Sequence, residues 1–298
     1  MVCHAVVTVK KESGMQSLNI IGAGRVGRTL GRLAVGSGAY RVVDCLARSL
    51  ASATVAVDFI GAGRACLALD GLQPADLWLL SVPDDAIAGV AQALLASGVV
   101  RPGCVVFHAS GAAEAELLAP LRAAGAHVAS LHPAFSFADP ARAIEQFAGT
   151  MCALEGDAAA CVALRDFAAA IGARPFALAP GGKAAYHAAL SVASNYLVTL
   201  TDMARQLARQ GGVDEQLLPA LLGPLMQGSL ANALNMGPQA ALTGPIVRGD
   251  VATVARHLAV LPANWQPAYR ALGERTVALA GERLSADAQQ RLLALLQG

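Results

Sequence analysis

The stretch IIGAGRVGRTLG, Ile20 to Gly31, decides how the first half of the chain folds. Gly22, Gly24 and Gly27 have the GxGxxG spacing directly after an apolar β-type run and at the start of a helical pattern. The first glycine permits a tight turn, the second lets a pyrophosphate approach the backbone, and the third lets strand and helix pack closely. The N-terminus of the helix then faces the anion. The stretch predicts a dinucleotide site, and a glycine-rich turn without a ligand is the alternative.

Apolar β-type runs alternate with alanine- and leucine-rich stretches through the first 180 residues. This rhythm predicts a Rossmann-type α/β domain with a doubly wound, mostly parallel sheet. The expected strands are 18–22, 40–47, 76–82, 104–108, 127–132, 150–156 and 174–180, and the expected helices are 27–36, 52–61, 84–96 and 112–124.

The pattern changes after Pro180, Gly181 and Gly182, where helical periodicity takes over. We therefore predict a flexible extension over 1–16, a nucleotide-binding domain over 17–181 and an all-α domain over 182–298. The expected helices of the second domain are 183–210, 214–235, 250–261, 264–281 and 285–297, with Asp214, Asp250 and Ser285 as N-caps.

Composition excludes several classes of protein. Of the 298 residues 55% are hydrophobic and 14% charged, and the net charge of +1 provides no basic stripe for nucleic acid. The six cysteines show no CxxC or metal-ligand spacing, so we expect reduced packing residues, no metal site and a cytoplasmic location. Prolines and glycines interrupt the charge-free run 216–247, which argues against a membrane span and favours a subunit interface.

The end of the second strand indicates the type of dinucleotide. An NAD site places Asp or Glu roughly 20 residues past the last glycine. That count reaches Ala47, followed by Arg48 and Ser49, and an arginine can grip the 2′-phosphate of NADP in bidentate fashion. We therefore predict NADP (NADPH) rather than NAD. Asp44 is the competing candidate for an NAD site, and an ordinary exposed loop charge is the alternative for Arg48.

Other strand ends supply further candidates, because ligands of such sheets lie outside the carboxyl ends of the strands. The stretch SVPDD (81–85) would border the riboses, with Asp84 as a helix N-cap. His132 in LHPAF would lie near the nicotinamide, either as a substrate contact or as a structural histidine. The predicted cofactor-binding residues are Gly22, Ala23, Gly24, Arg25, Val26, Gly27, Arg48, Ser49, Val82, Pro83 and Ser110.

Five stretches carry a family resemblance: ARS (47–49), HASG (108–111), LHPAFSF (131–137), KAAYHAALSVASN (183–195) and ALTGPIVRGD (241–250). Over residues 17–295 the chain resembles the superfamily of 6-phosphogluconate dehydrogenase and pyrroline-5-carboxylate reductase. Within it, the sequence is similar to a bacterial family of Rossmann-fold NADP oxidoreductases whose C-terminal helical domain has no assigned function. The resemblance implies a small polar substrate (a keto or hydroxy acid, or an imine) bound between the domains, and a homodimer formed by the C-terminal helices.

The resemblance also implies roles for the first helix of the second domain. In the related β-hydroxyacid dehydrogenases a lysine there acts at the reacting carbon, and an asparagine one turn later orients the substrate. Lys183 has the place of the lysine, but His187 has that of the asparagine, which leaves the acid/base role open between them. The alternative for Lys183 is an ordinary surface charge, and the alternative for His187 is a buried core histidine.

Helix geometry extends this candidate site. At about 100° per residue, His187 lies roughly 40° and Ser191 roughly 80° around the helix from Lys183, with Asn195 at the edge of that face. We predict Lys183 and His187 as catalytic residues, and His132, Ser191, Asn195 and Arg248 as substrate contacts. A sensor or scaffold that binds NADP without turnover is the second hypothesis. A flavin or deazaflavin partner in place of an organic substrate is the third.

Overall fold

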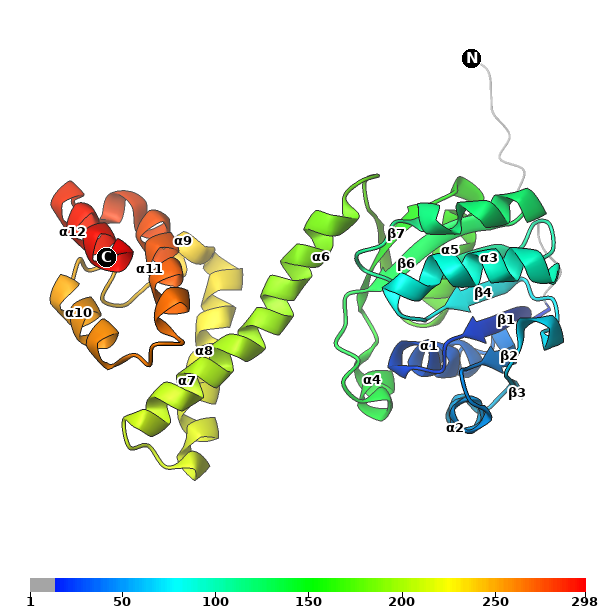
Figure 1. The fold of residues 1–298 in the computed structure, drawn as a ribbon, viewed down its shortest axis with the longest axis horizontal. Coiled ribbons are helices and arrows are strands. Elements are labelled where there is room, and N and C mark those ends of the chain that lie inside the picture. The colour runs from blue at the N-terminus through cyan, green and yellow to red at the C-terminus, as the bar shows by residue number, and fades with distance from the viewer. Residues whose placement is uncertain (1–13) are drawn as a thin grey trace, which may run out of the picture. The chain divides into compact units, whose positions relative to one another are not determined.

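The computed structural model describes residues 14–298, which form two compact units. The first unit ends at Ser194 and the second is Asn195–Gly298. Figure 1 labels helices and strands of both units and colours the chain by residue number. The predicted extension at 1–16 lies almost wholly outside the described residues, as does Cys3. The five described cysteines are free, and four of them are buried.

The first unit is built on one eight-stranded sheet with the order β3-β2-β1-β4-β5-β6-β7-β8. The pairs are parallel except that β7 runs antiparallel to β6. The predicted doubly wound, mostly parallel sheet is therefore confirmed. The strands are β1 Gln16–Ile21, β2 Tyr40–Leu46, β3 Arg64–Cys66, β4 Leu77–Leu80, β5 Val105–His108, β6 His127–Pro133, β7 Met151–Gly156 and β8 Arg174–Ala177.

Side-chain alternation along the strands divides the core into two layers. In β4, Leu77 and Leu79 pack on one face, while Trp78 and Leu80 pack on the other. Helices cover both faces because both are apolar. The helices of this unit are α1 Arg25–Gly36, α2 Leu50–Ile60, α3 Ile87–Ser97, α4 Pro140–Gln146, α5 Ala158–Ala170 and α6 Lys183–Ser191, with 3₁₀ turns η1 Leu69–Gly71, η2 Asp84–Ala86 and η3 Ala115–Ala124.

Two local predictions for this unit were wrong, and one strand was missed. The segment predicted as a helix at 112–124 is the 3₁₀ helix η3, and it contains Pro120, which lacks the N–H that an α-helix needs. Asp84 is not an N-cap, because η2 begins after Pro83 and the Asp84 carboxylate accepts a hydrogen bond from Ser110. The three-residue strand β3 was not predicted.

The second unit is entirely helical. α6 is followed directly by the π-helical turn η4 (Val192–Tyr196) and then by α7. Asp214, Asp250 and Ser285 accept hydrogen bonds from backbone N–H groups at the starts of their helices, so all three predicted N-caps are confirmed. The helices are α7 Leu197–Gln210, α8 Leu218–Met236, α9 Pro238–Ala241, α10 Val251–Val260, α11 Gln266–Ala280 and α12 Ala286–Gln297, with η5 Glu215–Leu217 and η6 Gly281–Arg283.

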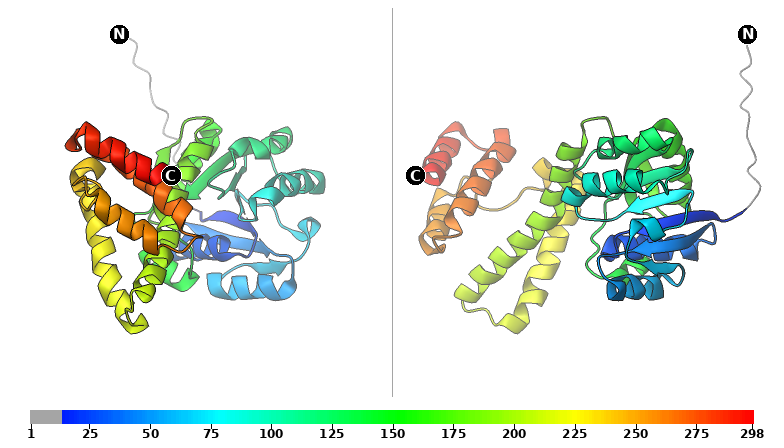
Figure 2. Two further views of the ribbon diagram at one scale, coloured as in Figure 1. Left: turned by 60° about the vertical axis from the view of Figure 1, so that its left-hand side comes forward. Right: turned by 45° about the vertical axis from the view of Figure 1, so that its right-hand side comes forward.

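Helices α7 and α8 form an antiparallel pair (Figure 2). Many of their large apolar side chains are exposed. In the pair, Thr201 Oγ1 lies 3.7 Å from Met226 Sδ. Leu225 is 66% exposed and Leu234 is 76% exposed. By length and composition alone, the described stretch Glu215–Met236 is apolar enough to cross a membrane, with a mean hydropathy of 1.2. Pro224 lies inside it.

Candidate functional site

The glycine turn between β1 and α1 is locked against the end of β4. Gly22 has φ +111°, and a Cβ there would stand 2.4 Å from the carbonyl oxygen of Ser81. A Cβ at Gly27 would stand 2.3 Å from the carbonyl oxygen of Gly22, to which the Ser81 hydroxyl donates a hydrogen bond of 2.8 Å. Gly24 is different, because the nearest atom to a Cβ there is 4.0 Å away. The backbone at Gly24 therefore borders open space.

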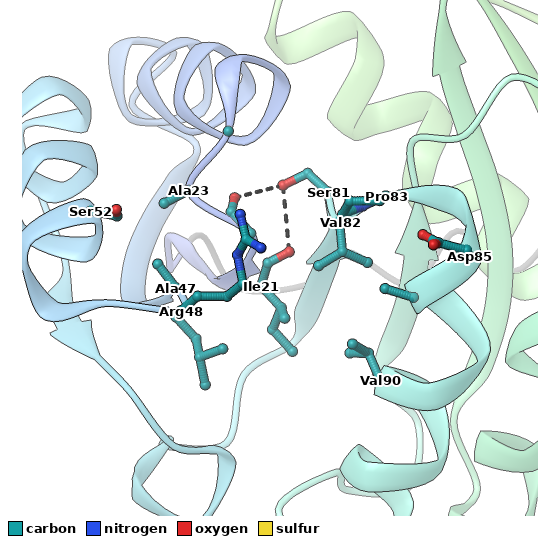
Figure 3. A pocket seen from close by; sticks show the side chains of 14 residues that line it. Ile21, Ala23, Ala47, Arg48, Ser52, Ser81, Val82, Pro83, Asp85 and Val90 are labelled. Atoms are coloured by element: carbon teal, nitrogen blue, oxygen red, sulfur yellow. Dashed lines mark hydrogen bonds between the residues drawn. The ribbon is translucent and has the colours of Figure 1, made fainter.

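That open space is a pocket of about 770 Å³ at the carboxyl ends of β1, β2 and β4. The strand order reverses between β1 and β4, the point at which doubly wound sheets bind ligands. Figure 3 shows Arg48 extending from the end of β2 toward the middle of the pocket, opposite Val82 and Pro83. The lining is Ile21, Gly22, Ala23, Gly24, Leu46, Ala47, Arg48, Ser52, Ser81, Val82, Pro83, Asp85, Ala86 and Val90.

The predicted cofactor residues distribute unevenly around this pocket. Six of them line it, whereas Arg25, Val26 and Gly27 form the first turn of α1 behind the glycine turn. Ser49 is outside the lining, because its hydroxyl accepts a hydrogen bond from Ser52 N–H and caps α2. The hydroxyl that lines the pocket belongs to Ser52, which was not predicted from the sequence. The six lining residues are Gly22, Ala23, Gly24, Arg48, Val82 and Pro83.

Asp44, the alternative ribose ligand, is a buried residue of β2, and both oxygens of its carboxylate accept hydrogen bonds. One oxygen accepts a hydrogen bond of 2.8 Å from Arg64 Nε, and the other accepts one of 2.6 Å from the backbone N–H of Gln73. Asp44 is not among the residues that line the pocket. Its carboxylate therefore ties together the β2–β3 edge of the sheet.

Farther along the same sheet edge, three rings gather where β6 ends and α6 begins. His132 Nδ1 and the Tyr186 hydroxyl are 2.9 Å apart, and their ring centroids are 5.6 Å apart. The ring centroid of His187 lies 6.3 Å from that of His132. A Cβ at Gly111 would stand 2.7 Å from both His132 Nε2 and His187 Cδ2. Only glycine at 111 leaves room for both histidine rings.

Lys183 is buried beneath this cluster, with no exposed surface. Its Nζ donates a hydrogen bond of 2.5 Å to the carbonyl oxygen of Ser110 and another to the Ser130 hydroxyl. Burial lowers the pKa of Lys183 to about 8, although Glu155 and Glu114 act in the opposite direction. The lysine thus ties the start of α6 to the loop after β5 and to strand β6.

The loop after β5 is held by His108, which is fully buried. Its Nδ1 accepts a hydrogen bond from the backbone N–H of Ser110, so Nε2 carries the proton and donates to the carbonyl oxygen of Glu114. Burial lowers the pKa of His108 to about 4 and keeps the ring neutral. The Ser110 hydroxyl accepts from the N–H groups of Ala112 and Ala113 and donates to Asp84. Ser110 therefore shapes the loop from within.

The remaining predicted substrate residues are divided between the two units. Ser191 is half-buried at the end of α6, and His187 is exposed. Asn195 and Arg248 are exposed residues of the second unit. The structure thus brings Lys183, His187 and His132 together, and a role for Asn195 and Arg248 stays a prediction. Tyr186 and Gly111 were not predicted as site residues, although they lie in the stretches 183–195 and 108–111 that carry the family resemblance.

Within residues 14–298, no group of three or more His, Cys, Asp or Glu residues could hold a metal ion. The polar groups near the rings are instead hydroxyls, imidazoles and a buried amine. These groups can donate hydrogen bonds and exchange protons.

Comparison with known families accounts for both parts of the chain. Residues 8–133 match a Rossmann-like domain, and residues 150–276 match a domain of unknown function, DUF2520. The chain is a Rossmann-like protein with a DUF2520 domain. No curated protein matches it.

Solved structures show the same fold as this DUF2520 protein. A candidate NADP oxidoreductase from Bacteroides fragilis is 19% identical, with a TM-score of 0.73 over 89% of this chain and 98% of that one. A protein from Thermotoga maritima is 26% identical, with a TM-score of 0.63 over 93% and 98% of the two chains. An imine reductase from a Pseudomonas species is 18% identical, with a TM-score of 0.61 over 95% and 93%.

Proposed function

We propose that this protein is an NADP-dependent oxidoreductase that acts on a small polar substrate. The observation that carries the proposal is the open pocket above Gly24 at the β1/β4 switch point, with Arg48 at one side and the ring cluster farther along the same sheet edge. A dinucleotide on this edge would extend from β2 toward β5 and β6. The names of the Bacteroides and Pseudomonas proteins agree with this chemistry.

The pocket supports NADP over NAD. An NAD site needs a free carboxylate at the end of the second strand, and the Asp44 carboxylate is bound to Arg64 and Gln73 instead. Arg48 and Ser52 supply a cation and a hydroxyl at the pocket wall, and both suit an extra phosphate.

Residues of this chain would transfer the proton to the reacting atom of the substrate. When bound, NADPH supplies the hydride. His187 is exposed, so it can exchange its proton with water, and it adjoins His132 and Gly111. Lys183 is buried and hydrogen-bonded to Ser110 and Ser130, which fits a positioning role. We therefore assign proton transfer to His187.

Release of isotope from the cofactor tests turnover. With deuterium at C4 of NADPH and a panel of keto acids, aldehydes and imines, we expect the label to move into one class of product. His187→Asn should slow this transfer about 100-fold or more, because a general acid contributes about that much. If NADPH binds and no label leaves it with any candidate, the protein is an NADP sensor or scaffold.

We also propose that α7 and α8 form a homodimer interface. The described stretch Glu215–Met236 is only 6% buried in its most apolar window, and large exposed apolar patches mark interfaces. Gly223, Pro224 and Gly228 make this helix a poor membrane span, which favours a second copy as the covering surface and a cytoplasmic location.

Light scattering measures the dimer directly. We expect a mass near twice the 30.2 kDa of one chain, and a mass near that of one chain for the double variant Leu225→Glu, Leu234→Glu. Val162→Glu is the matched control, because Val162 is also highly exposed (61%) but lies on α5 of the first unit. A monomeric wild type, or wild type that partitions into neutral lipid vesicles, would contradict the dimer.

A further inference from the structure

Tyr186 on α6 and His132 at the end of β6 form a pair that proton transfer at His187 does not use. The Tyr186 hydroxyl lies 2.9 Å from His132 Nδ1, and the two rings meet edge to face at 84°. On its other side Tyr186 packs against Phe176, with the ring centroids 6.1 Å apart. The tyrosine ring is therefore held in place, and its hydroxyl is directed at one nitrogen of the histidine.

The direction of this hydrogen bond follows from the protonation of both groups. Burial raises the pKa of Tyr186 to about 12, so the hydroxyl keeps its proton at neutral pH. Burial, together with Lys183 and His187, lowers the pKa of His132 to about 4, so that ring is neutral and holds one proton. Among the described residues, His132 is the only hydrogen-bond partner of the Tyr186 hydroxyl. Tyr186 therefore donates to Nδ1, and the histidine proton resides on Nε2.

The Nε2 side of the His132 ring faces Gly111, where a larger residue would not fit. A Cβ at Gly111 would stand 2.7 Å from His132 Nε2 and 2.9 Å from its Cε1. His132 is partly exposed, and among the described residues its Nε2 has no hydrogen-bond partner. The Nε2–H group is thus a fixed, neutral donor beside His187.

The surrounding charges favour an acceptor that gains negative charge. Lys183 is the charged group that most lowers the pKa of His132, with a smaller effect of His187 in the same direction and an opposing one of Asp84. A cationic iminium needs a carboxylate in contact with it, and among the described residues no carboxylate is hydrogen-bonded to His132 or His187. Asp84 accepts from Ser110, Glu155 from Ala115 N–H, and Glu114 from Lys183 N–H. The field around Nε2 therefore suits an oxygen that is becoming an alkoxide.

We infer that Tyr186 is a positioning residue that holds His132 as a neutral Nε2–H donor, and that this donor selects a carbonyl oxygen, rather than an imine nitrogen, as the atom reduced. The inference rests on the proposed oxidoreductase function. Reduction adds the hydride to the carbonyl carbon while the C=O π electrons move onto oxygen, and oxygen then takes the proton from His187. NADPH is oxidised to NADP⁺, and His187 regains its proton from water.

Nitrogen NMR of the histidine side chains tests the tautomer without any substrate. In ¹⁵N-labelled protein at pH 7, we expect a protonated Nε2 and an unprotonated Nδ1 for His132. Tyr186→Phe should remove the hydrogen bond to Nδ1 and shift that resonance toward a mixture of tautomers. His108 is an internal control, since backbone groups fix its tautomer. A wild-type His132 that carries its proton on Nδ1, or on both nitrogens, overturns the inference.

The second unit offers a matched control variant. Tyr269 and His257 form a similar pair, with the hydroxyl 2.7 Å from Nδ1. Tyr269→Phe should shift the His257 resonances and leave those of His132 unchanged. An unchanged His132 spectrum in Tyr186→Phe, or a His132 change in Tyr269→Phe, would count against the pair.

Turnover tests the substrate class. On a matched ketone and imine, we expect the wild type to reduce the ketone at least about tenfold faster and Tyr186→Phe to lower kcat about tenfold with the KM for NADPH unchanged. Faster reduction of the imine overturns the selection of carbonyl substrates. Absence of NADPH binding overturns the proposed function instead, while the tautomer result stands on its own.

Discussion

Gly24→Val should weaken NADPH binding more than about 100-fold, a loss of about 2.7 kcal/mol of binding free energy, while the chain stays folded. A Cβ at position 24 meets only the Ser81 carbonyl oxygen, at 4.0 Å, so added methyl groups project into the pocket where the pyrophosphate would lie. Gly24 has φ −72°, which valine can adopt, so we expect the melting temperature to change by only about 3 °C. Fluorescence titration and thermal unfolding measure the two quantities.

Two further substitutions separate binding from folding. Gly22→Ala should destabilise the domain by about 3 kcal/mol, because its Cβ would stand 2.4 Å from backbone at a φ of +111°. Arg48→Gln should weaken NADPH about tenfold and leave NADH unchanged, because the guanidinium would contact only the 2′-phosphate. Unchanged NADPH affinity in Gly24→Val would show that the cofactor does not bind in this pocket.

Much of the fold was predictable because its signals are local. The runs at β1, β4 and β6 are apolar and bounded by turns. The GxGxxG stretch marks where the first strand ends and the first helix begins. β3 was missed because three residues carry no periodicity. The antiparallel direction of β7 was not predictable either, since a buried strand has the same composition in both directions. η3 could have been recognised from Pro120.

The site was predictable in outline and not in its contacts. Helical spacing placed Lys183 and His187 on one face, but only the structure shows that the loop after β5 covers Lys183 and leaves His187 exposed. A helical wheel does not say what packs against each part of a face. Tyr186 lies between the two and gave no signal, because its partner His132 is 54 positions away. Ser49 and Ser52 could not be distinguished until the start of α2 was known.

Lys183→Ala should lower the free energy of unfolding by about 3 kcal/mol. Removing a fully buried side chain leaves a cavity. The Ser130 hydroxyl loses its hydrogen-bond donor, and the carbonyl oxygen of Ser110 keeps only the 3.4 Å hydrogen bond from that hydroxyl. The same change releases the loop that positions Gly111, so the tautomer of His132 and turnover should both be disturbed. Denaturant unfolding measures the stability. A loss below about 1 kcal/mol would mean that the lysine does not hold this loop.

Lys183→Met separates the charge from the cavity. Because burial lowers the pKa of Lys183 from 10.5 to about 8, the native state loses this proton at a lower pH than the unfolded chain does. Between pH 8 and 10.5 the unfolded chain binds more protons, so this group makes the wild type more stable as pH rises. Methionine cannot titrate. The free energy of unfolding of the wild type, taken relative to that of Lys183→Met, should therefore rise with pH across this window. Other titrating groups largely cancel in the difference. A difference that is flat with pH would show that Lys183 is solvated and free of the buried contacts on which its positioning role depends.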